Sequence, residues 1–300
     1  LGIFFAYFPN FVLNEDNADK LRLRLDKMLF QNQEMSCVDA LSPDKKQLFG
    51  EWRNAFNTKI LAFDIVQLKD KKKVLDAVTS TYCQFCIDAV GKEAIDASTV
   101  FKETSIEINA VTLSKKFPGA RFIHILRDPR ANFVSLKRGV ETYYGPKGND
   151  NVNTVMMSLI HRLQLSMGLI GANKKIIGKE AYFVLRYEDL VANTRQTMGR
   201  VAEWLGIEFQ NSLLTPTLFA SPVLSNNFTG PKVTSISVAG IEKWRENISP
   251  DEESIINFFL EKEMTSHGYG PETLSDEEIE SVGTFYNWSN YQYFYKDFYS

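Results

Sequence analysis

Two arginines, an aspartate and a serine follow an apolar run closely in FPGARFIHILRDPRANFVSLKRG, residues 117–139. The apolar residues at 122–126 are few and β-prone, which predicts an interior strand of a parallel sheet. Pro129 suits the first turn of a helix, where its missing N–H costs nothing. Arg127 would then lie at the carboxyl edge of a strand and Ser135 about two turns into the next helix. Ligands of open α/β sheets bind at that edge, so these side chains predict an anion site.

A second predicted strand ends in a similar way. The apolar segment AYFV at 181–184 leads into the charged and aromatic residues Arg186 and Tyr187. If the two strands are parallel, this end emerges at the same edge as Arg127. A tyrosine there can pack against a nucleobase, or it can be an ordinary aromatic residue at the rim of a core. Both interpretations remain open at this point.

The composition limits the classes of protein. The chain has 300 residues, 44% of them hydrophobic, which suffices for one large core or one core with a subdomain. A net charge of −3 gives no general attraction to nucleic acid. No uninterrupted apolar run reaches the ~18 residues that a membrane span needs. The apolar start LGIFFAYFPNF lacks the basic leader of a signal peptide, so a cytoplasmic location is favoured.

Predicted strands and helices alternate along the chain. Strands are expected at 98–104, 121–126 and 181–187, and helices at about 21–29, 72–90, 108–117, from 129 through 135, 153–177, 189–206 and 249–264. Ser249, Pro250 and Glu252 have the pattern of a capping box at the start of the last helix. This alternation predicts an α/β fold with a doubly wound parallel sheet flanked by helices, in a single domain over 1–270. Residues 271–300 are expected to pack on it as an aromatic extension.

Neither the three cysteines nor the three histidines are spaced as metal ligands, so no metal is expected. Cys83 and Cys86 lie at helical spacing, which favours ordinary packing over a redox pair. His124 lies in the middle of a predicted strand between apolar residues, which favours a hydrogen-bonded interior histidine over a general base.

The order of these motifs resembles the sulfotransferases that use 3′-phosphoadenosine 5′-phosphosulfate (PAPS). The resemblance covers roughly residues 98–270 and rests on FPGARFIHILRDPRANFVS, RYEDL, GIEKWREN and HGYG. It implies a P-loop-type sulfotransferase fold in which Arg127 and Ser135 hold the 3′-phosphate of the nucleotide. It also implies that Tyr187 lies near the adenine. A guanidinium fork and a helical hydroxyl are suitable phosphate ligands.

The segment SISVAGIEKWREN at 235–247 supplies two more candidates for nucleotide binding. A helix is expected there, carrying Lys243 and Trp244 just after a loop rich in hydroxyl groups. A tryptophan with basic neighbours can equally be part of an amphipathic helix face that contacts no ligand.

Within the family, the chain resembles the tyrosylprotein and bacterial branches more than the cytosolic phenol-type enzymes. The strand end VFKETS at 100–105 has no histidine, and the resemblance implies that Lys102 stabilises the transferring sulfuryl group. It also implies a carboxylate base from the acidic pair Glu15 and Asp16 in FPNFVLNEDN, and the choice between the two stays open. The alternatives are an exposed lysine at a strand end and a solvated helix N-terminus.

One element of the family pattern is missing. PAPS enzymes hold the 5′-phosphosulfate in a basic-Ser-Gly-Thr-Thr loop before their first helix, and no such sequence occurs in the 300 residues. LGIFFAYFPNF resembles the helix that follows this loop. We therefore expect a strand and such a loop within about six residues upstream of Leu1.

The resemblance predicts transfer of a sulfuryl group from PAPS to a hydroxyl or amine acceptor, giving a sulfate ester and 3′-phosphoadenosine 5′-phosphate (PAP). The acceptor can be a carbohydrate, a metabolite, a lipid or a protein tyrosine, and a homo-oligomer is left open. One alternative is a P-loop-type nucleotide kinase, which is disfavoured because no G-x-x-x-x-G-K-[ST] occurs. The other is a catalytically inactive module that binds PAP or another nucleotide.

The C-terminal stretch FYNWSNYQYFYKDFYS at 285–300 holds nine aromatic residues in sixteen positions. Left exposed, it would form a sizeable apolar patch. It can pack across its own domain, form a wall of the acceptor site or make an oligomer contact.

Overall fold

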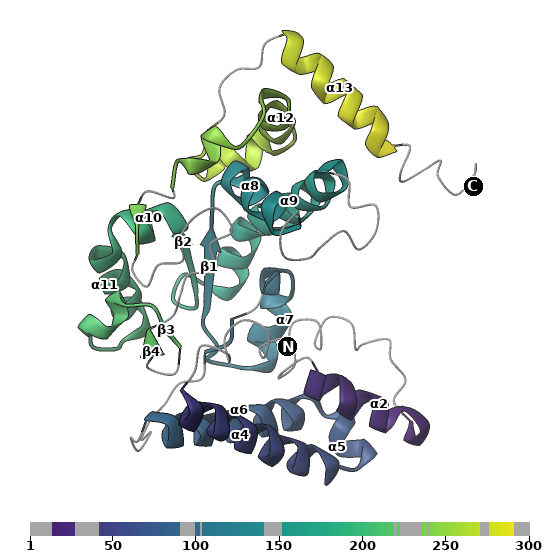
Figure 1. The fold of residues 1–300 in the computed structure, drawn as a ribbon, viewed down its shortest axis with the longest axis vertical. Coiled ribbons are helices and arrows are strands. Elements are labelled where there is room, and N and C mark those ends of the chain that lie inside the picture. Colours follow the sequence, from purple (N-terminus) through teal and green to yellow (C-terminus); the bar gives the residue numbers. More distant parts are fainter. Residues whose placement is uncertain are drawn as a thin grey trace. The chain divides into compact units, whose positions relative to one another are not determined.

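A computed structural model describes most of the chain (Figure 1). The described residues are 14–27, 42–90, 100–102, 104–140, 152–218, 221–222, 236–238, 241–270 and 276–290. The chain divides into two compact units: unit 1 comprises residues 1–104 and 215–224, and unit 2 comprises 105–214 and 225–300. The helix expected at 1–11 lies outside the described residues.

Unit 1 is a small helical cluster. Its described elements are α2 (Glu15–Asp26), α4 (Pro43–Leu61), α5 (Ile65–Lys69), α6 (Lys71–Val90) and the antiparallel pair β3 (Thr217–Leu218) and β4 (Ser221–Pro222). Large apolar side chains from the helices form its core, among them Leu21, Phe49, Trp52, Phe56 and Phe85. The helix predicted at 72–90 is confirmed as α6, in which Cys83 is half-buried.

Polar contacts join α2 to α4 within unit 1. Asp26 accepts hydrogen bonds from Nε and Nη2 of Arg53, both at 2.9 Å, and from the side chain of Asn57 at 2.9 Å. The bonds from Arg53 hold the pKa of Asp26 below its ordinary value, and burial opposes this shift. At the other end, Asn14 and Asn17 form a capping box that starts α2. The first turn of α2 therefore has a defined backbone.

Unit 2 contains a parallel pair of strands. Its described elements are η4 (Ile106–Asn109), α7 (Ala110–Lys116), β1 (Phe122–Leu126), α8 (Pro129–Gly139), α9 (Val152–Ile177), β2 (Tyr182–Arg186), α10 (Tyr187–Ala192), α11 (Thr194–Leu205), η6 (Asn211–Leu214), η8 (Lys243–Glu246), α12 (Pro250–Ser266) and α13 (Asp276–Asn290). β1 and β2 lie side by side (Figure 1), in a register that pairs Phe122 with Tyr182 and Leu126 with Arg186. Both predicted strands, their parallel direction and the long helix after α8 are confirmed. The interior position predicted for β1 is not, because Ile123 and Ile125 are 38% and 55% exposed.

The described sheet is smaller than the one expected. Two parallel strands and many helices are present, and a larger doubly wound sheet stays a prediction. The strand predicted at 98–104 is wrong for the described residues, because 100–102 form no strand and 104 lies in a turn. Val100 is 82% exposed. β-propensity produces a strand only where a neighbouring strand pairs with the backbone, and none does so there among the described residues.

Two predicted helices differ from those observed. The single helix expected at 189–206 is divided into α10 and α11 at Asn193, whose φ of −130° and ψ of 50° are not helical. Thr194 and Thr197 donate side-chain bonds to backbone carbonyls around this break, so local polar side chains compete with a continuous helix. The helix expected in 235–247 is reduced, among its described residues, to the short 3₁₀ turn η8 and a residue of 3₁₀ turn at 238.

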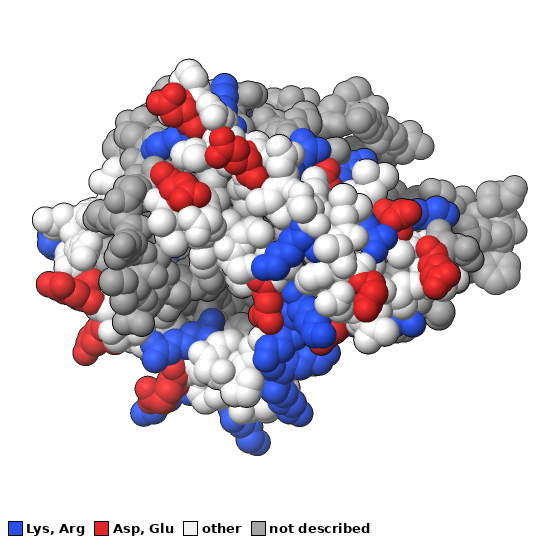
Figure 2. All heavy atoms as spheres, turned by 90° about the horizontal axis from the view of Figure 1, so that it is seen from below, with Lys and Arg blue, Asp and Glu red and all other residues white. Residues whose placement is uncertain are grey.

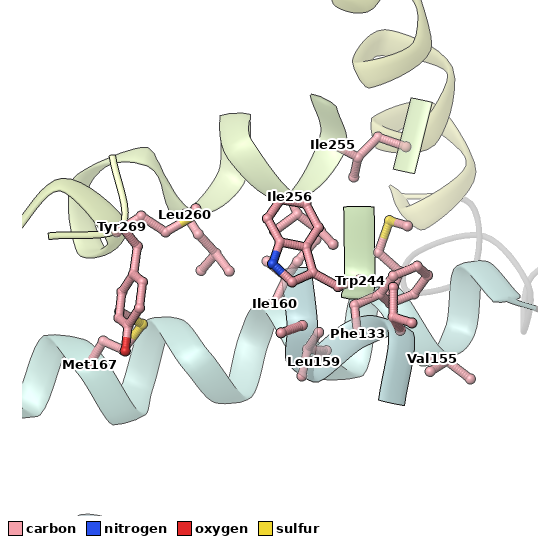
Figure 3. Packing of buried hydrophobic residues seen from close by; sticks show 14 of the residues in the cluster. Phe133, Val155, Leu159, Ile160, Met167, Trp244, Ile255, Ile256, Leu260 and Tyr269 are labelled. Carbon is pink, nitrogen blue, oxygen red and sulfur yellow. The ribbon is translucent and has the colours of Figure 1, made fainter. Parts of the chain in front are cut away.

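The core of unit 2 lies between α8, α9, α12 and η8 (Figure 3). Phe133 of α8 and Ile256, Leu260 and Met264 of α12 are fully enclosed there. The predicted capping box is confirmed: Ser249 and Glu252 bond reciprocally, with Pro250 at the first helical position. The other oxygen of Glu252 accepts a bond of 2.6 Å from Lys137, which fastens the start of α12 to α8.

The described beginning of the aromatic extension packs on its own unit. Phe285 of α13 is buried, with its ring centre 5.8 Å from that of Phe259 and 5.8 Å from that of Trp288. Tyr286, by contrast, is 52% exposed. Phe285 therefore packs on unit 2, the predicted role of the whole extension stays a prediction, and residues 291–300 lie outside the described ones.

One described helix, α9, is long and apolar enough to cross a membrane by composition alone. One of its faces belongs to the core of unit 2, through Val155, Met156, Leu159, Ile160 and Met167. Lysine and arginine side chains occur along it as well. We therefore interpret α9 as the core helix of unit 2.

Figure 2 shows basic and acidic side chains interspersed on one face of the molecule, in keeping with the small net charge.

His124 is confirmed as an interior histidine with hydrogen-bond partners. Its Nδ1 lies 2.8 Å from the hydroxyl of Tyr182, and its Nε2 lies 3.0 Å from Oγ of Ser166 on α9. Burial lowers the pKa of His124 below its ordinary value; the nearby carboxylate of Glu107 acts in the opposite direction, and His267 adds to the lowering. The cluster therefore favours the neutral imidazole.

The free energy of unfolding is expected to fall as the pH drops below about 6.5, the ordinary pKa of histidine. The unfolded chain then takes up a proton that the folded chain binds only at lower pH, so stability present above this pH is lost. Urea unfolding between about pH 7.5 and pH 5.5 measures the slope. We expect a shallower slope in His124→Gln and an unchanged one in His161→Gln, at an exposed position. Equal slopes in His124→Gln and the parent would contradict this assignment.

Candidate nucleotide-binding site

The predicted residues Arg127 and Tyr187 meet at the carboxyl edge of the two strands. Arg127 directly follows β1, Tyr187 directly follows β2, and the Arg127 guanidinium carbon lies 4.9 Å from the centre of the tyrosine ring. The Nε of Arg127 is buried and has no hydrogen-bond partner among the described residues. An unpaired buried donor costs about 1–3 kcal/mol. An anion at this edge would provide the missing acceptor.

Ser135 lies in α8, about two turns after Arg127, as predicted. Pro129 occupies the first turn of α8, and Asp128 caps it by accepting a bond from the backbone N–H of Arg130 at 2.9 Å. Phe133 and Val134 are buried toward the core, whereas Ser135 is half-buried. One short sequence thus carries the guanidinium of Arg127 at the end of β1 and the hydroxyl of Ser135 in the helix that follows.

A buried ion pair holds the turn that follows Arg127. The carboxylate of Asp128 accepts bonds from Nε and Nη2 of Arg130, at 3.0 and 2.8 Å. Their side chains are 11% and 8% exposed. Burial alone would lower the pKa of Arg130, but its hydrogen bonds to Asp128 and the charges of Asp128 and Glu253 outweigh burial and raise that pKa. The guanidinium of Arg130 is therefore held in place by its carboxylate partners. The Nε of Arg127, by contrast, has no hydrogen-bond partner among the described residues.

Trp244 belongs to the core rather than to an open surface. It is 4% exposed, and the guanidinium carbons of Arg130 and Arg245 each lie 4.5 Å from its ring centre. These are cation–π contacts, so the ring stabilises the buried Arg130. Lys243, its neighbour in η8, is exposed. Binding of nucleotide by Lys243 and Trp244 stays a prediction.

Glu188 connects three segments at the strand ends. Its Oε1 accepts a bond of 3.0 Å from the backbone N–H of Asp128, and its Oε2 accepts one of 2.7 Å from the hydroxyl of Tyr269. The ring of Tyr269 lies 4.3 Å from the guanidinium carbon of Arg186. Burial and then the carboxylate of Glu188 raise the pKa of Tyr269, so the hydroxyl remains a donor.

The proposed catalytic residues belong to unit 1. Glu15 is the first residue of α2 and its side chain is exposed. The helix dipole stabilises an anion at that position. Lys102 is also exposed and lies outside any strand. The side chain of Asp16 lies outside what the structure describes, so both roles stay predictions.

Sequence reasoning missed the supporting contacts of this site. R-D-P-R and Y-E were recognised as motifs, but the pairing of Asp128 with Arg130 and the link from Glu188 to Tyr269 were not expected. Asp128 and Glu188, which follow the two strands by two positions, were the available signal, since buried carboxylates require partners. The HGYG segment gave the position of Tyr269 but not its role.

A comparison with protein families agrees with the motifs. A model of a sulfotransferase family matches residues 14–211, a range that includes Arg127, Ser135 and Tyr187. One similar solved structure is the sulfotransferase domain from the curacin biosynthetic pathway, with 16% identity, coverage of 85% of this chain and 83% of that chain, and a TM-score of 0.45. Another is the sulfotransferase domain of the Synechococcus PCC 7002 olefin synthase, with 18% identity, 90% coverage of each chain and a TM-score of 0.44. No curated protein matches the sequence.

Proposed function

The chain belongs to the sulfotransferase family, and we propose that it transfers a sulfuryl group from PAPS to a hydroxyl or amine acceptor, with release of PAP. The observation that carries this proposal is the side chain of Arg127. It lies at the carboxyl edge of a parallel strand pair, against an aromatic ring, with a buried Nε that lacks a partner among the described residues.

In this proposal Arg127 and Ser135 bind the 3′-phosphate and Tyr187 contacts the adenine. Guanidinium presents a planar set of donors that matches phosphate oxygens, and the charged partner strengthens each bond. The contact with Tyr187 orients the guanidinium before the nucleotide arrives. Lys243, exposed in η8, is our candidate for a further phosphate contact, whereas the buried ring of Trp244 would support Arg130 in the turn after Arg127.

The transfer itself requires a proton acceptor and a cation. The acceptor oxygen or nitrogen attacks sulfur, the bond between sulfur and the bridging oxygen of the 5′-phosphate breaks, and its electron pair leaves with PAP. We propose that Glu15 or Asp16 takes the proton of the acceptor and that Lys102 stabilises the charge on the transferring group. Such a loose transition state is analogous to that of phosphoryl transfer, in which positioned charges supply most of the stabilisation.

Arg127→Ala is expected to weaken PAP binding by about tenfold to a hundredfold, from roughly 1.5–3 kcal/mol for a charged hydrogen-bonded contact. Ser135→Ala should cost less, because its hydroxyl is neutral. Isothermal titration calorimetry measures both. Adenosine 5′-phosphosulfate, which lacks the 3′-phosphate, should bind equally to the parent and to both variants.

Arg121→Ala provides a matched control for this measurement. Arg121 precedes the amino end of the same strand, where it donates to the carbonyl of Trp204, so its loss should leave PAP affinity unchanged. If Arg127→Ala binds PAP as well as the parent does, the assignment of the 3′-phosphate site is wrong.

Transfer is tested separately from binding. Incubation with PAPS and a panel of carbohydrates, phenols, lipids and tyrosine peptides, followed by mass spectrometry, detects the addition of a sulfuryl group. PAP binding without transfer to any acceptor would favour the inactive module. Binding of ATP in preference to PAP would favour the kinase.

A further inference from the structure

The first bond of Glu188 fixes the spacing between the two main nucleotide contacts. Asp128, whose N–H donates to Oε1 of Glu188 at 3.0 Å, is the residue directly after Arg127. Glu188 is the residue directly after Tyr187. One hydrogen bond therefore joins the backbone next to Arg127 to the side chain next to Tyr187, across the ends of β1 and β2.

The second bond anchors the same carboxylate to the turn after α12. The backbone of Tyr269 is held there by its N–H, which donates to the carbonyl of Met264 at 2.9 Å, and by its carbonyl, which accepts from Arg130 at 3.4 Å. Tyr269 is buried at the edge of the core (Figure 3). The hydroxyl of Tyr269 therefore donates to Glu188 from a backbone that is itself held by hydrogen bonds.

Gly268 allows this turn to approach the end of β2. Its φ is 75°, in the left-handed region that favours glycine. A Cβ added there would lie 3.1 Å from Nη1 of Arg186. The close approach explains how the ring of Tyr269 covers the Arg186 guanidinium while its hydroxyl meets Glu188.

We propose that Glu188 is a positioning residue that sets the relative placement of Arg127 and Tyr187 for the 3′-phosphoadenosine group, with Tyr269 holding its carboxylate. This inference rests on the proposed function. Both oxygens of Glu188 already accept hydrogen bonds, so the residue acts through its neighbours rather than as a base. Side chains that are already held in their binding positions lose less conformational entropy when the nucleotide binds. More of the energy of their contacts then contributes to the affinity.

Three single variants test the proposal. Glu188→Gln keeps an oxygen for the N–H of Asp128 but replaces the acceptor of the Tyr269 hydroxyl with an NH₂ group. Tyr269→Phe removes the hydroxyl and retains the ring. Asp189→Asn removes a neighbouring exposed carboxylate and is the matched control for loss of charge.

The readout is the ratio of the dissociation constants of adenosine 5′-phosphate and PAP, which isolates the contribution of the 3′-phosphate. We expect Glu188→Gln to lower this ratio by about twofold to tenfold, the effect of one hydrogen bond, and Tyr269→Phe to lower it by the same amount or less. Asp189→Asn should keep the ratio of the parent. The double variant Glu188→Gln, Tyr269→Phe should lose less than the two single losses combined, since both remove one shared bond.

The possible results separate this inference from the function on which it rests. If Glu188→Gln and Tyr269→Phe lower the melting temperature but keep the parent's ratio, both residues are merely structural and the positioning role is wrong. If the parent itself binds adenosine 5′-phosphate as tightly as PAP, the proposed function fails and the inference fails with it. A loss of ratio in Asp189→Asn equal to that in Glu188→Gln would assign the effect to net charge and overturn the proposal.

Discussion

Turnover is expected to fall by about 10²–10⁴-fold in the double variant Glu15→Gln, Asp16→Asn, the usual contribution of a general base. PAP affinity should stay within a few-fold of that of the parent, because neither residue is assigned to the nucleotide. Rates of PAP formation at saturating PAPS and acceptor measure turnover, and titration with PAP measures affinity. The single variants then show which carboxylate carries the proton.

Asp19→Asn is the matched control on the same helix. Asp19 is exposed and pairs with Arg22 at 2.6 Å, so its loss removes a carboxylate from α2 without touching the acidic pair. Full activity in the double variant would eliminate the carboxylate mechanism. A loss in Asp19→Asn as large as in the double variant would point instead to the charge of the helix.

Asp128→Asn is expected to destabilise the protein by about 3–5 kcal/mol, the cost of breaking one side of a buried ion pair. Asparagine retains an oxygen to cap α8, but its amide places an N–H₂ group against the Arg130 guanidinium. The carboxylate that then remains within ion-pair distance of Arg130 among the described residues is that of Glu253, at 3.4 Å. Urea denaturation measures the change, read as a shift in midpoint at a constant m-value.

Glu242→Gln serves as the comparison for this variant. It removes an exposed pair with Arg245, which is worth about 0–1 kcal/mol. The double variant Asp128→Asn, Arg130→Met removes both buried charges. Its free energy of unfolding should fall by less than that of Asp128→Asn alone, since no uncompensated cation remains. A change in Asp128→Asn as small as that in Glu242→Gln would show that the pair is not isolated from solvent.

The elements that rest on local patterns could be predicted from the sequence. Both strands at the site are short apolar runs followed by charged residues, and the start of α12 has its cap, proline and glutamate at fixed spacing. The strand at 98–104 failed because its propensity needs a pairing partner that no local pattern reveals. The prediction of one helix over 189–206 failed at Asn193. The helical periodicity of the apolar residues continues across this residue, but side-chain hydrogen bonds to nearby backbone carbonyls compete with a continuous helix.

The contacts around the site could not be predicted in the same way. Arg127 and Ser135 come from one short segment, so a motif can indicate both as candidates. The partners of Glu188 and Arg130 come from segments far along the chain, and burial decides which polar groups must pair. Trp244 illustrates the difference: its sequence neighbours indicated a basic helix face, whereas its ring packs inside the core against Arg130.

The sequence separations of these contacts determine when the site can be completed during synthesis. Asp128 and Glu188 are 60 residues apart, Glu188 and Tyr269 are 81 apart, and Arg130 and Tyr269 are 139 apart. Contacts of such long range form late, because the entropy of closing each loop is lost before the contact stabilises the chain. Until α12 leaves the ribosome, the apolar faces of α8 and α9 lack their partner. The contacts around Arg127 and Tyr187 therefore cannot be completed before Tyr269 has been synthesised, and a nascent chain stalled before Tyr269 presents exposed apolar surface to chaperones and proteases.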